Sequence, residues 1–476
     1  MRPIWAGLAA AALATGLAAS ACAQPEAKAA DLILRGGRIV DVETATVSAP
    51  VDVLVREGRI AAIRPAGKQA LRGARIVDAS SRFLAPGYVE MHAHILTHPW
   101  LPNGEIARQY DREASLQILR SLLAHGITTV RDPGSPTEAA IVFRRLAAEH
   151  VIVSPEIVTA GRIINASDFD PEPFMPVKTA EDVRREVAWQ ADRGVDFIKV
   201  YYSMPPELIG VAVEAAHARG LKVVGHLQLT DWGTAAALGL DGVAHAADWS
   251  EDQLPEAQRA AYRGDIKARI DWINAVEPDS PAYQAMARAM AAHGMFVDPT
   301  LMAIHTKFFG DDPVYRNPKG RRFVPDVFWT GWEKGSFTSG WTAADYARAH
   351  AAYPRLPRLI RALHDAGVLI TVGTDTPTPW TIPGVSFHQE LALLKETGVS
   401  NAEVLKWATL NGAKALGRDD RVGRLEAGYE ADIVVLRGNP LDDLAKAGDI
   451  ALVVSDGRIF EPDQLAGPQP RSGEQQ

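Results

Sequence analysis

The sequence has little of three features that would each define a protein class. Cys22 is the single cysteine among 476 residues, which excludes an internal disulfide framework. Beyond the N-terminal segment, no apolar run reaches the roughly 18 residues that span a bilayer, so no membrane span is expected. There is no basic run, and the net charge of -8 disfavours nucleic acid as a partner.

The composition is that of an ordinary globular protein. Hydrophobic residues make up 47% of the chain and charged residues 23%, which is neither the pattern of a disordered segment nor that of a fibrous protein. A chain of 476 residues exceeds what one small core requires. We therefore expect one large domain or two domains.

The N-terminus has the layout of a signal peptide. Arg2 supplies a positive residue, an apolar run covers 4–19, and Ala21-Cys22-Ala23 is an Ala-x-Ala cleavage site. We expect residues 1–23 to be removed and the mature protein to be periplasmic or secreted. As an alternative, Cys22 carries a lipid anchor, since residues 17–22 loosely resemble a lipobox.

Short β-rich runs lie near both ends of the chain. They are broken by glycines and charges and cover 31–41, 51–60, 75–78, 431–436 and 451–459. Glu57-Gly58 and Asp456-Gly457 are followed in both cases by Arg-Ile, as if one hairpin were used twice. We predict a composite β-sandwich assembled from residues 31–84 and 418–465.

The middle of the chain repeats a unit of helix, glycine and apolar strand. The glycines that close the helices are Gly126, Gly194, Gly220, Gly294 and Gly367, and each precedes a continuous apolar run. Together with the runs 88–92, 156–160 and 242–245 they predict eight strands. We expect an α/β fold, a (β/α)8 TIM barrel over 85–417. The alternative is a doubly wound open sheet, although no Gly-x-Gly-x-x-Gly follows the first strand.

Polar side chains gather where the predicted strands end. His92 and His94 are two residues apart, so on a strand both imidazoles point to the same side, which is half of a metal site. The remaining strand ends carry metal-ligand or acid/base types: Arg131, Asp132, Lys199, His226, His245, Asp298 and Asp375. In a TIM barrel these ends meet at the face where the chemistry takes place.

Several of these motifs are shared with one known family. Residues 86–94, 197–200, 224–226, 243–245 and 373–375, with the closing segments 408–417 and 423–433, resemble the metal-dependent amidohydrolase superfamily. The resemblance covers 31–460 and is greatest with the imidazolonepropionase-related branch. That branch includes Xaa-Pro dipeptidases and N-acyl-amino-acid hydrolases, among them ochratoxin-degrading enzymes.

The resemblance implies a site with two divalent metal ions. It assigns His92, His94 and Asp375 to the more buried ion and His226 with His245 to the more exposed one. Lys199 would be carboxylated and bridge both ions, and two cations held close together require such an anionic bridge. Zinc suits these ligands best, and manganese, cobalt and iron remain alternatives.

The resemblance also implies a mechanism, the hydrolysis of the amide bond of a dipeptide or an N-acyl amino acid by a metal-bridging hydroxide. Asp375 would take the proton of the water and later give it to the departing nitrogen. A mononuclear imidazolonepropionase-like or deaminase-like cyclic amide hydrolase would not need Lys199. A lactonase or phosphotriesterase would use the same binuclear centre. An exported solute-binding protein without catalysis would be expected to lack the ligands.

Other residues are candidates for contact with the substrate. Tyr201 is placed to donate a hydrogen bond to a developing oxyanion, with simple packing as the alternative. Arg131 or Arg162 would pair with a substrate carboxylate unless each forms an internal ion pair. His388 and Glu390 follow the eighth predicted strand and would position substrate or support ligands.

The segment 306–346 is long for a loop between a strand and a helix, and it is rich in aromatic residues. It also contains Lys307, Lys319, Arg321 and Arg322, so it would suit covering a site that accepts an apolar, anionic substrate. The alternative is a contact between subunits. A homo-oligomer is expected.

Overall fold

The computed structural model describes residues 32–67, 73–96, 109–168, 172–262, 265–315 and 318–466. The expected signal peptide, residues 1–23, and the alternative lipid anchor at Cys22 lie outside the described residues. Among the described helices, none is long and apolar enough to cross a membrane.

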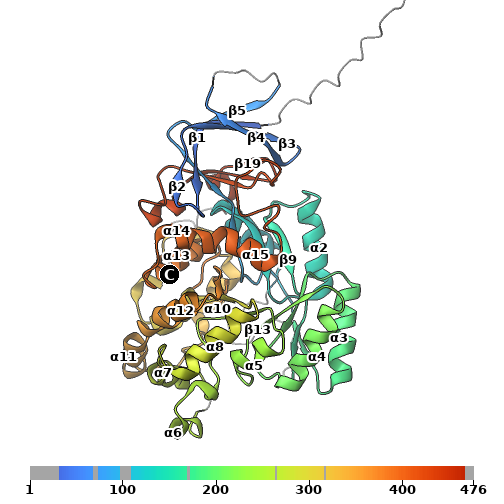
Figure 1. The fold of residues 1–476 in the computed structure, drawn as a ribbon, viewed down its shortest axis with the longest axis vertical. Helices are drawn as coiled ribbons and strands as arrows, with labels where there is room; N and C mark the ends of the chain where they lie inside the picture. Colours follow the sequence, from blue (N-terminus) through green and yellow to red (C-terminus); the bar gives the residue numbers. More distant parts are fainter. Residues whose placement is uncertain are drawn as a thin grey trace, which may run out of the picture.

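Strands from both ends of the chain form one sheet at one end of the molecule (Figure 1). The order is β19-β18-β17-β6-β1-β3-β4, with β2 and β5 also paired to β1. Its strands are β1 (Leu32–Asp41), β2 (Thr46–Val47), β3 (Val51–Arg56), β4 (Arg59–Pro65), β5 (Arg75–Asp78), β6 (Phe83–Pro86), β17 (Ile433–Leu436), β18 (Ile450–Ser455) and β19 (Arg458–Phe460). The expected joining of the two termini is thus present.

Strand β1 joins the two halves of this sheet, which are β3 with β4 on one side and β6, β17, β18 and β19 on the other. Its first part pairs with β3 and its later part with β6, and the register shifts between Leu34 and Gly37. Gly36 has φ of 75° at the shift, a conformation that costs glycine little. One buried apolar cluster contains residues of both halves, for example Val53 from β3 and Ile433 from β17. The two halves therefore share a core.

The two hairpins that look alike in sequence have the same backbone conformation. Glu57 and Gly58 join β3 to β4 with φ of 51° and 75°. Asp456 and Gly457 join β18 to β19 with φ of 48° and 72°. Two successive positive φ values are the signature of a type I′ turn, whose twist matches that of the strands. The repeated hairpin is confirmed.

The middle of the chain supplies parallel strands in two sheets. A seven-stranded sheet has the order β11-β10-β12-β13-β14-β15-β16, and a three-stranded sheet the order β7-β8-β9. The strands are β7 (Tyr88–Glu90), β8 (Ile127–Asp132), β9 (Glu156–Thr159), β10 (Ile163–Asn165), β11 (Phe174–Pro176), β12 (Phe197–Val200), β13 (Lys222–Gly225), β14 (Gly242–Ala244), β15 (Phe296–Asp298) and β16 (Leu369–Ile370). All eight expected strands have a counterpart, whereas β10 and β11 were not expected.

The two parallel sheets are not paired into one continuous eight-stranded ring, so the closed barrel stays a prediction. Strand β10 pairs with β12 and takes the place expected for β9. Backbone hydrogen bonds outside the regular strand pairing join the two sheets. The Asp196 amide donates to the Thr159 carbonyl at 2.9 Å, and the Met91 amide donates to the Val372 carbonyl at 2.8 Å. The structure is thus an α/β fold with parallel sheets that are joined at both edges.

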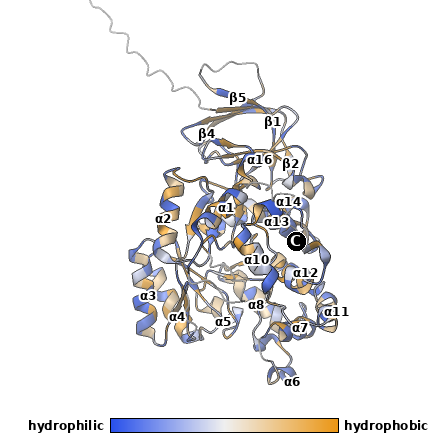
Figure 2. Cartoon of the chain, turned by 180° about the vertical axis from the view of Figure 1, so that it is seen from behind, coloured by the Kyte–Doolittle hydropathy of each residue, from blue (hydrophilic) through white to orange (hydrophobic). Residues whose placement is uncertain are grey.

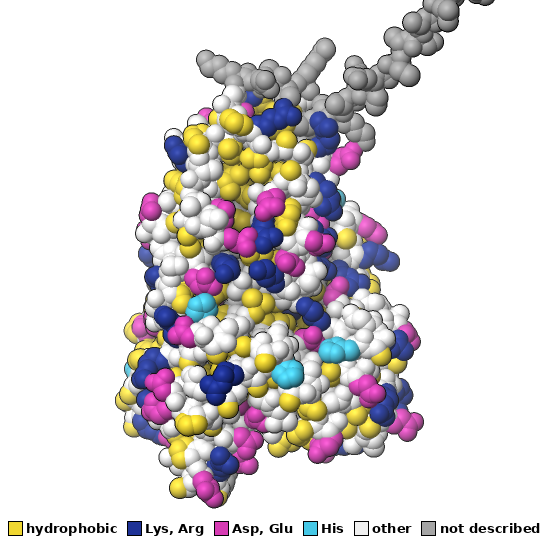
Figure 3. Space-filling model, viewed as in Figure 1, with side chains coloured by type: hydrophobic (Ala, Val, Ile, Leu, Met, Phe, Trp, Pro, Cys, Tyr) yellow, Lys and Arg dark blue, Asp and Glu magenta, His cyan; other side chains and the backbone are white. Residues whose placement is uncertain are grey.

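Helices pack around the parallel strands. They are α1 (Arg112–Ala124), α2 (Thr137–Ala148), α3 (Ala180–Asp192), α4 (Pro206–His217), α5 (Trp232–Ala237), α6 (Glu256–Arg259), α7 (Ile266–Ala275), α8 (Pro281–Ala292), α9 (Leu301–Phe308), α10 (Asp326–Lys334), α11 (Ala343–Ala352), α12 (Arg355–Asp365), α13 (Val385–Lys395), α14 (Asn401–Lys406), α15 (Gly412–Leu416) and α16 (Pro462–Leu465). Figure 2 shows hydrophilic and hydrophobic residues side by side on outer helices such as α3 and α4. Figure 3 shows charges of both signs interspersed over one face.

The glycines expected to end helices do so. Gly126, Gly194, Gly220, Gly294 and Gly367 have φ between 68° and 94°. This left-handed conformation ends a helix and turns the chain toward the next strand. The repeated pattern of helix, glycine and strand in the sequence is therefore a structural repeat.

The segment 306–346 packs against the loop that follows Asp375. The rings of Trp329 and Trp332 lie 5.4 and 5.9 Å from that of Trp380, measured between centroids. Trp332 and Phe328 are also buried. Aromatic side chains of this segment are thus buried inside the protein, next to the loop that follows Asp375.

Candidate metal centre

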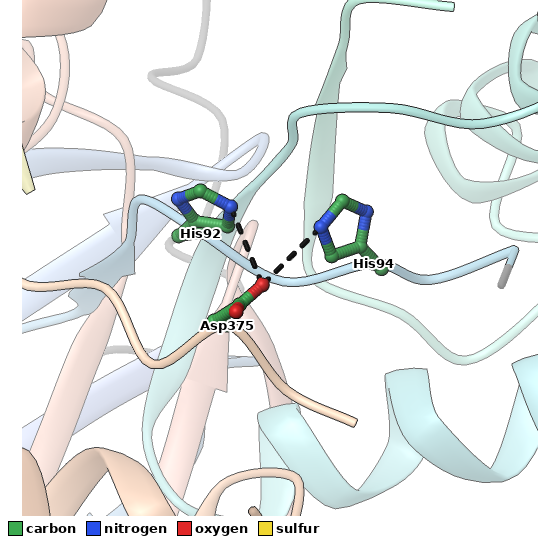
Figure 4. A group of neighbouring side chains, drawn as sticks. All are labelled: His92, His94 and Asp375. Carbon is green, nitrogen blue, oxygen red and sulfur yellow. Dashed lines mark ion pairs between the residues drawn. The ribbon is translucent and has the colours of Figure 1, made fainter. Parts of the chain in front are cut away.

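Three of the expected ligands converge where β7 and β16 end. His92 and His94 follow β7, and Asp375 lies in the segment after β16 (Figure 4). The Asp375 Oδ1 atom is 3.5 Å from His92 Nε2 and 3.3 Å from His94 Nε2. Their candidate ligand atoms all lie within 4.8 Å of one another. Two imidazole nitrogens and a carboxylate oxygen at this spacing form a donor set for a divalent cation.

The orientation of His92 is set by a buried carboxylate. His92 Nδ1 donates to Asp298 Oδ1 at 2.6 Å, so Nε2 is left to face Asp375. His94 Nδ1 lies 3.2 Å from the Gly134 carbonyl oxygen, which favours the same arrangement for its ring. Both rings therefore present the nitrogen atom that a metal would bind.

Arg131 is buried and makes two side-chain hydrogen bonds inside the protein, while its Nη1 has no partner in the described part of the chain. It is 1% exposed, donates from Nη2 to Asp298 at 2.5 Å and donates from Nε to the Met91 carbonyl at 2.6 Å. A substrate carboxylate could reach it only by breaking this pair. We therefore revise the expected substrate contact of Arg131: this residue holds Asp298, which in turn holds His92.

His226 and His245 form a second group beside the first. His226 Nδ1 and His245 Nε2 are 2.8 Å apart, and the His245 ring lies 5.3 Å from the His92 ring between centroids. His245 Nδ1 is 2.8 Å from Thr300 Oγ1. Burial, followed by the neighbouring positive charges, holds the pKa of each of these two histidines well below its usual range. Neutral imidazoles are the form that binds metal.

Lys199 is a buried amine without a partner. It is 2% exposed, and its Nζ makes no hydrogen bond. Burial lowers the pKa of Lys199 to about 8, an effect that the charge of Asp298 opposes and that of Arg131 reinforces. A lysine in this environment readily gives up its proton, and the neutral amine is the form that reacts with carbon dioxide.

The residues fit a pair of metal ions by the chemistry of their donors. His226 Nε2 and Lys199 Nζ are buried polar atoms that find no partner in the described part of the protein. Such atoms are costly unless something binds them. The six side chains that the sequence motifs single out thus form a triad, an adjoining histidine pair and a buried lysine.

Asp375 is held in its ionised form. Burial alone would raise its pKa, but the hydrogen bond with His94 and the charges of His92 and His245 hold the pKa of Asp375 well below its usual range. Its backbone is also tied to the first ligand, since the Asp375 amide donates to the His92 carbonyl at 2.8 Å. An ionised carboxylate here can bind a cation and accept a proton.

Three residues of the centre have strained backbone conformations. The φ values of His245, Thr300 and Asp375 are 80°, 47° and 59°. A positive φ is unfavourable for residues with a side chain and persists only where the surroundings enforce it. Each of these residues follows a strand end, so the strain aims their side chains into the centre.

Two buried glutamates hold the supporting backbone. Glu90 accepts from the His92 amide at 2.9 Å and from the Thr374 amide at 3.0 Å, linking β7 to the segment of Asp375. Glu390 accepts from the amides of Leu301 and Met302 at 2.8 and 2.5 Å. That contact fixes the start of α9, next to Thr300, so the predicted supporting position of Glu390 agrees with its contacts.

The other predicted substrate contacts divide into one near the centre and two away from it. The Tyr201 ring packs edge-on against His226 with centroids 4.6 Å apart. Arg162 instead donates twice to Glu186, at 3.1 and 2.7 Å. His388 is 3.0 Å from the His125 carbonyl oxygen through Nε2 and packs against Tyr88. We therefore revise the substrate-binding expectation for Arg162 and His388, since Arg162 pairs with Glu186 and His388 Nε2 faces the His125 carbonyl.

Asp298, Thr300 and Glu90 support the centre and were given no role from the sequence. Asp298 ends a predicted strand, and its position there was the available signal. Thr300 and Glu90 have no such signal, because the hydrogen bonds that define their roles join segments far apart in the sequence.

Comparison with known proteins gives one family match. A model described as "Amidohydrolase family" matches residues 83–460. An imidazolonepropionase of Rubrobacter xylanophilus is 25% identical over 454 residues, which cover 90% of this chain and 94% of that protein. An adenine deaminase of Paracoccus denitrificans is 34% identical over 106 residues, and the matched stretch covers 22% of this chain and only 16% of that protein.

Solved structures share the fold over most of the chain. The crystal structure of a prolidase complexed with N-methylphosphonate-L-proline has a TM-score of 0.67 at 21% identity. The match covers 90% of this chain and 99% of that chain. At this identity the likeness concerns the fold.

Proposed function

The chain belongs to the amidohydrolase family, and from this premise we propose that it hydrolyses the amide bond of a dipeptide or an N-acyl amino acid at a centre of two divalent metal ions. The observation that carries the proposal is the convergence of His92, His94 and Asp375 beside the His226 and His245 pair. The buried, unpartnered amine of Lys199 completes the donor set.

Each expected ligand has a place in this proposal. His92, His94 and Asp375 would hold one ion, and His226 with His245 the other. Lys199, carboxylated on Nζ, would join the two and supply the negative charge that two neighbouring cations require. Zinc suits nitrogen and carboxylate ligands best. When bound, the ions supply Lewis acidity, which polarises a carbonyl group and makes water more acidic.

The protein's own residues then orient the substrate and move the protons. Asp375 accepts a proton from the attacking water at a carboxylate oxygen and gives it to the departing nitrogen. Asp298 and Arg131 keep the His92 ring in place. Tyr201, next to His226, is positioned to donate its hydroxyl hydrogen to the developing oxyanion.

The scaffold is proposed to act as a (β/α)8 barrel. The backbone hydrogen bonds at both edges of the parallel sheets support that reading, as does the fold shared with the prolidase. Residues 31–84 and 418–465 would form the β-sandwich domain and 85–417 the barrel. We also propose that the protein is exported, on the signal peptide pattern of 1–23.

The experiment is a panel of dipeptides, including Xaa-Pro dipeptides, and N-acyl amino acids, tested on metal-replete enzyme. A lactone and a phosphotriester serve as controls. We expect release of a free amino acid from at least one dipeptide or N-acyl amino acid. Hydrolysis of the lactone or the phosphotriester alone would refute the proposal.

A second candidate is a mononuclear hydrolase of cyclic amides. The match to an imidazolonepropionase along 90% of the chain favours it, and so does the compact triad of His92, His94 and Asp375. The two candidates differ in metal content. About two ions per chain support the binuclear amide hydrolase, and about one ion supports the mononuclear enzyme.

A further inference from the structure

Two basic side chains near the metal centre have no counterion. Arg269 lies on α7 and Lys307 on α9. Neither side chain makes a hydrogen bond or an ion pair within the described part of the protein, and the Nε of Arg269 is buried without a partner. Elsewhere in the fold, half-buried arginines such as Arg144 and Arg162 are paired with carboxylates.

Aromatic rings support both cations and leave their N–H groups available. Lys307 Nζ lies 4.7 Å from the centroid of the Phe337 ring. The guanidinium carbon of Arg269 lies 5.1 Å from the Trp249 ring. A ring face attracts a cation through its quadrupole but accepts few of its hydrogen bonds. The donors of both residues are therefore free to bind another group.

The two cations are close to the metal centre and to each other. Lys307 is near enough to Asp375 and Arg269 for both charges to affect it, and both basic residues influence His226. Arg269 also interacts electrostatically with Tyr201, whose ring packs on His226. Burial lowers the pKa of Lys307 to about 8, so most of it is still protonated at neutral pH. The geometry agrees: Trp249, whose ring Arg269 faces, lies four residues after His245. The helix α9, which carries Lys307, begins directly after Thr300, whose Oγ1 is 2.8 Å from His245 Nδ1.

Two like charges, partly removed from water and lacking an anion, raise the free energy of the folded protein. The carboxylates that act on them from a distance, Asp375 on Lys307 and Asp265 on Arg269, form no ion pair with either residue in the described part of the chain. Asp265, one turn before Arg269, accepts from the Ala268 amide at 2.8 Å and caps α7 instead. Such an arrangement is compensated when an anion from outside binds between the two donors.

We propose that Arg269 and Lys307 form the binding site for an anionic group of the substrate, a carboxylate on the amino acid that is released. The inference rests on the proposed amide hydrolysis and names the residues that would bind the free carboxylate of its substrates. Arg269 offers two parallel N–H donors to a carboxylate, and Lys307 offers a point charge. Phe337 and Trp249 form apolar walls beside it.

This site distinguishes among the reactions that a binuclear centre supports. A dipeptide or an N-acyl amino acid carries the carboxylate that the two cations require. A neutral lactone or phosphotriester carries none and would leave both charges unpaired. The expected preference is therefore for a free acid over its otherwise identical carboxamide.

The test compares N-acetyl-L-phenylalanine with N-acetyl-L-phenylalaninamide on metal-replete enzyme. The variants are Lys307→Met and Arg269→Met, with Lys307→Arg as the variant that keeps the charge. Lys334→Met, an exposed lysine at the end of α10, is the matched control. We expect each Met variant to lower kcat/KM for the free acid by about 10- to 100-fold, mainly through KM, and to leave the carboxamide within about 3-fold. Lys307→Arg should keep most of the preference.

Calorimetric titration with the same two compounds separates this inference from the proposed function. Binding of the free acid but not of the carboxamide, lost in Lys307→Met and kept in Lys334→Met, supports the anion site even if neither compound is hydrolysed. In that case amide hydrolysis fails and the anion site stands. Equal losses for both compounds in the Met variants overturn the inference. So does a wild-type protein that shows no preference for the free acid in either binding or turnover.

Discussion

His92 donates through Nδ1 to the Oδ1 atom of Asp298 at 2.6 Å, while Arg131 binds the other carboxylate oxygen of Asp298. The chain Arg131, Asp298, His92 is almost entirely buried. A histidine that binds metal commonly donates its second N–H to a carboxylate, which fixes the tautomer and the ring orientation. Asp298 would therefore act on a metal ion bound at this site through His92.

We predict that Asp298→Asn weakens metal binding by about 10- to 100-fold. An amide keeps the shape of the side chain but removes the negative charge between His92 and Arg131. Competition against a chelator of known affinity measures the effect. Asp279→Asn, at an exposed aspartate, is the control and should bind metal like the wild type. An unchanged metal affinity in Asp298→Asn would show that Asp298 has no such role.

We predict that Lys199→Ala lowers kcat/KM by at least about 100-fold, because the anionic link between two ions is lost. Acetate or propionate should restore part of the activity, since either can place a carboxylate in the space that the side chain leaves. The activity of the wild type measured in the same salts is the control. A variant that retains normal turnover without added acid would count against the bridging role of Lys199.

We predict that Gly58→Ala destabilises the composite sheet by about 1–3 kcal/mol. Gly58 has φ of 75°, which strains any residue with a side chain, and a Cβ there would lie 2.1 Å from Oδ1 of Asp456 in the other hairpin. The exposed Asp456 side chain would have to turn, which would disturb its ion pair with His150. Gly294→Ala is a matched control, because Gly294 has φ of 68° but nothing within 4 Å of the added carbon. Urea unfolding should show the larger loss for Gly58→Ala. Equal losses would mean that the contact between the hairpins is unimportant.

The pH dependence of stability should include a contribution from Asp248. Burial, aided by the charge of Asp231, raises the pKa of Asp248 from 3.8 to about 7. Between these values the unfolded chain releases the proton while the folded protein retains it, so this contribution lowers the free energy of unfolding as pH rises from about 4 to 7.

We therefore predict that in Asp248→Asn the free energy of unfolding falls less between pH 4 and 7, by at least about 1 kcal/mol. One pKa unit corresponds to about 1.4 kcal/mol. Denaturant unfolding of both proteins at several pH values between 4 and 8 measures it. The difference in slope is informative whatever stability the substitution itself costs. Parallel curves for the two proteins would contradict the prediction.

The features that the sequence predicted are those with local signals. The glycines after helices and the hairpins at Glu57-Gly58 and Asp456-Gly457 depend on the conformational preferences of single residues. His92, His94 and Asp375 were identifiable because a strand end brings polar residues to one face of the fold. The joining of both termini in one sheet followed from similar β-rich runs at each end.

The features that the sequence missed depend on contacts between distant segments. Arg131 is a strand-end arginine in sequence, and only the structure shows that it is buried and paired with Asp298. Strands β10 and β11 are three residues each, too short for a periodic signal. Arg269 and Lys307 lie on separate helices, so the sequence around either residue could not show that both lie near the centre.

Strand β6 has a further consequence for how the protein is made. It ends at Pro86, a few residues before His92, and pairs with β17, which begins at Ile433. The Gly87 amide donates to the Asp432 carbonyl at 2.9 Å. During synthesis β6 emerges nearly 350 residues before its partner, and this sheet edge stays unpaired until β17 has been made. The segment that leads to His92 and His94 is therefore fixed by the pairing of β6 with β17 only late in folding. Chains truncated before β17 should fail to assemble a stable metal centre.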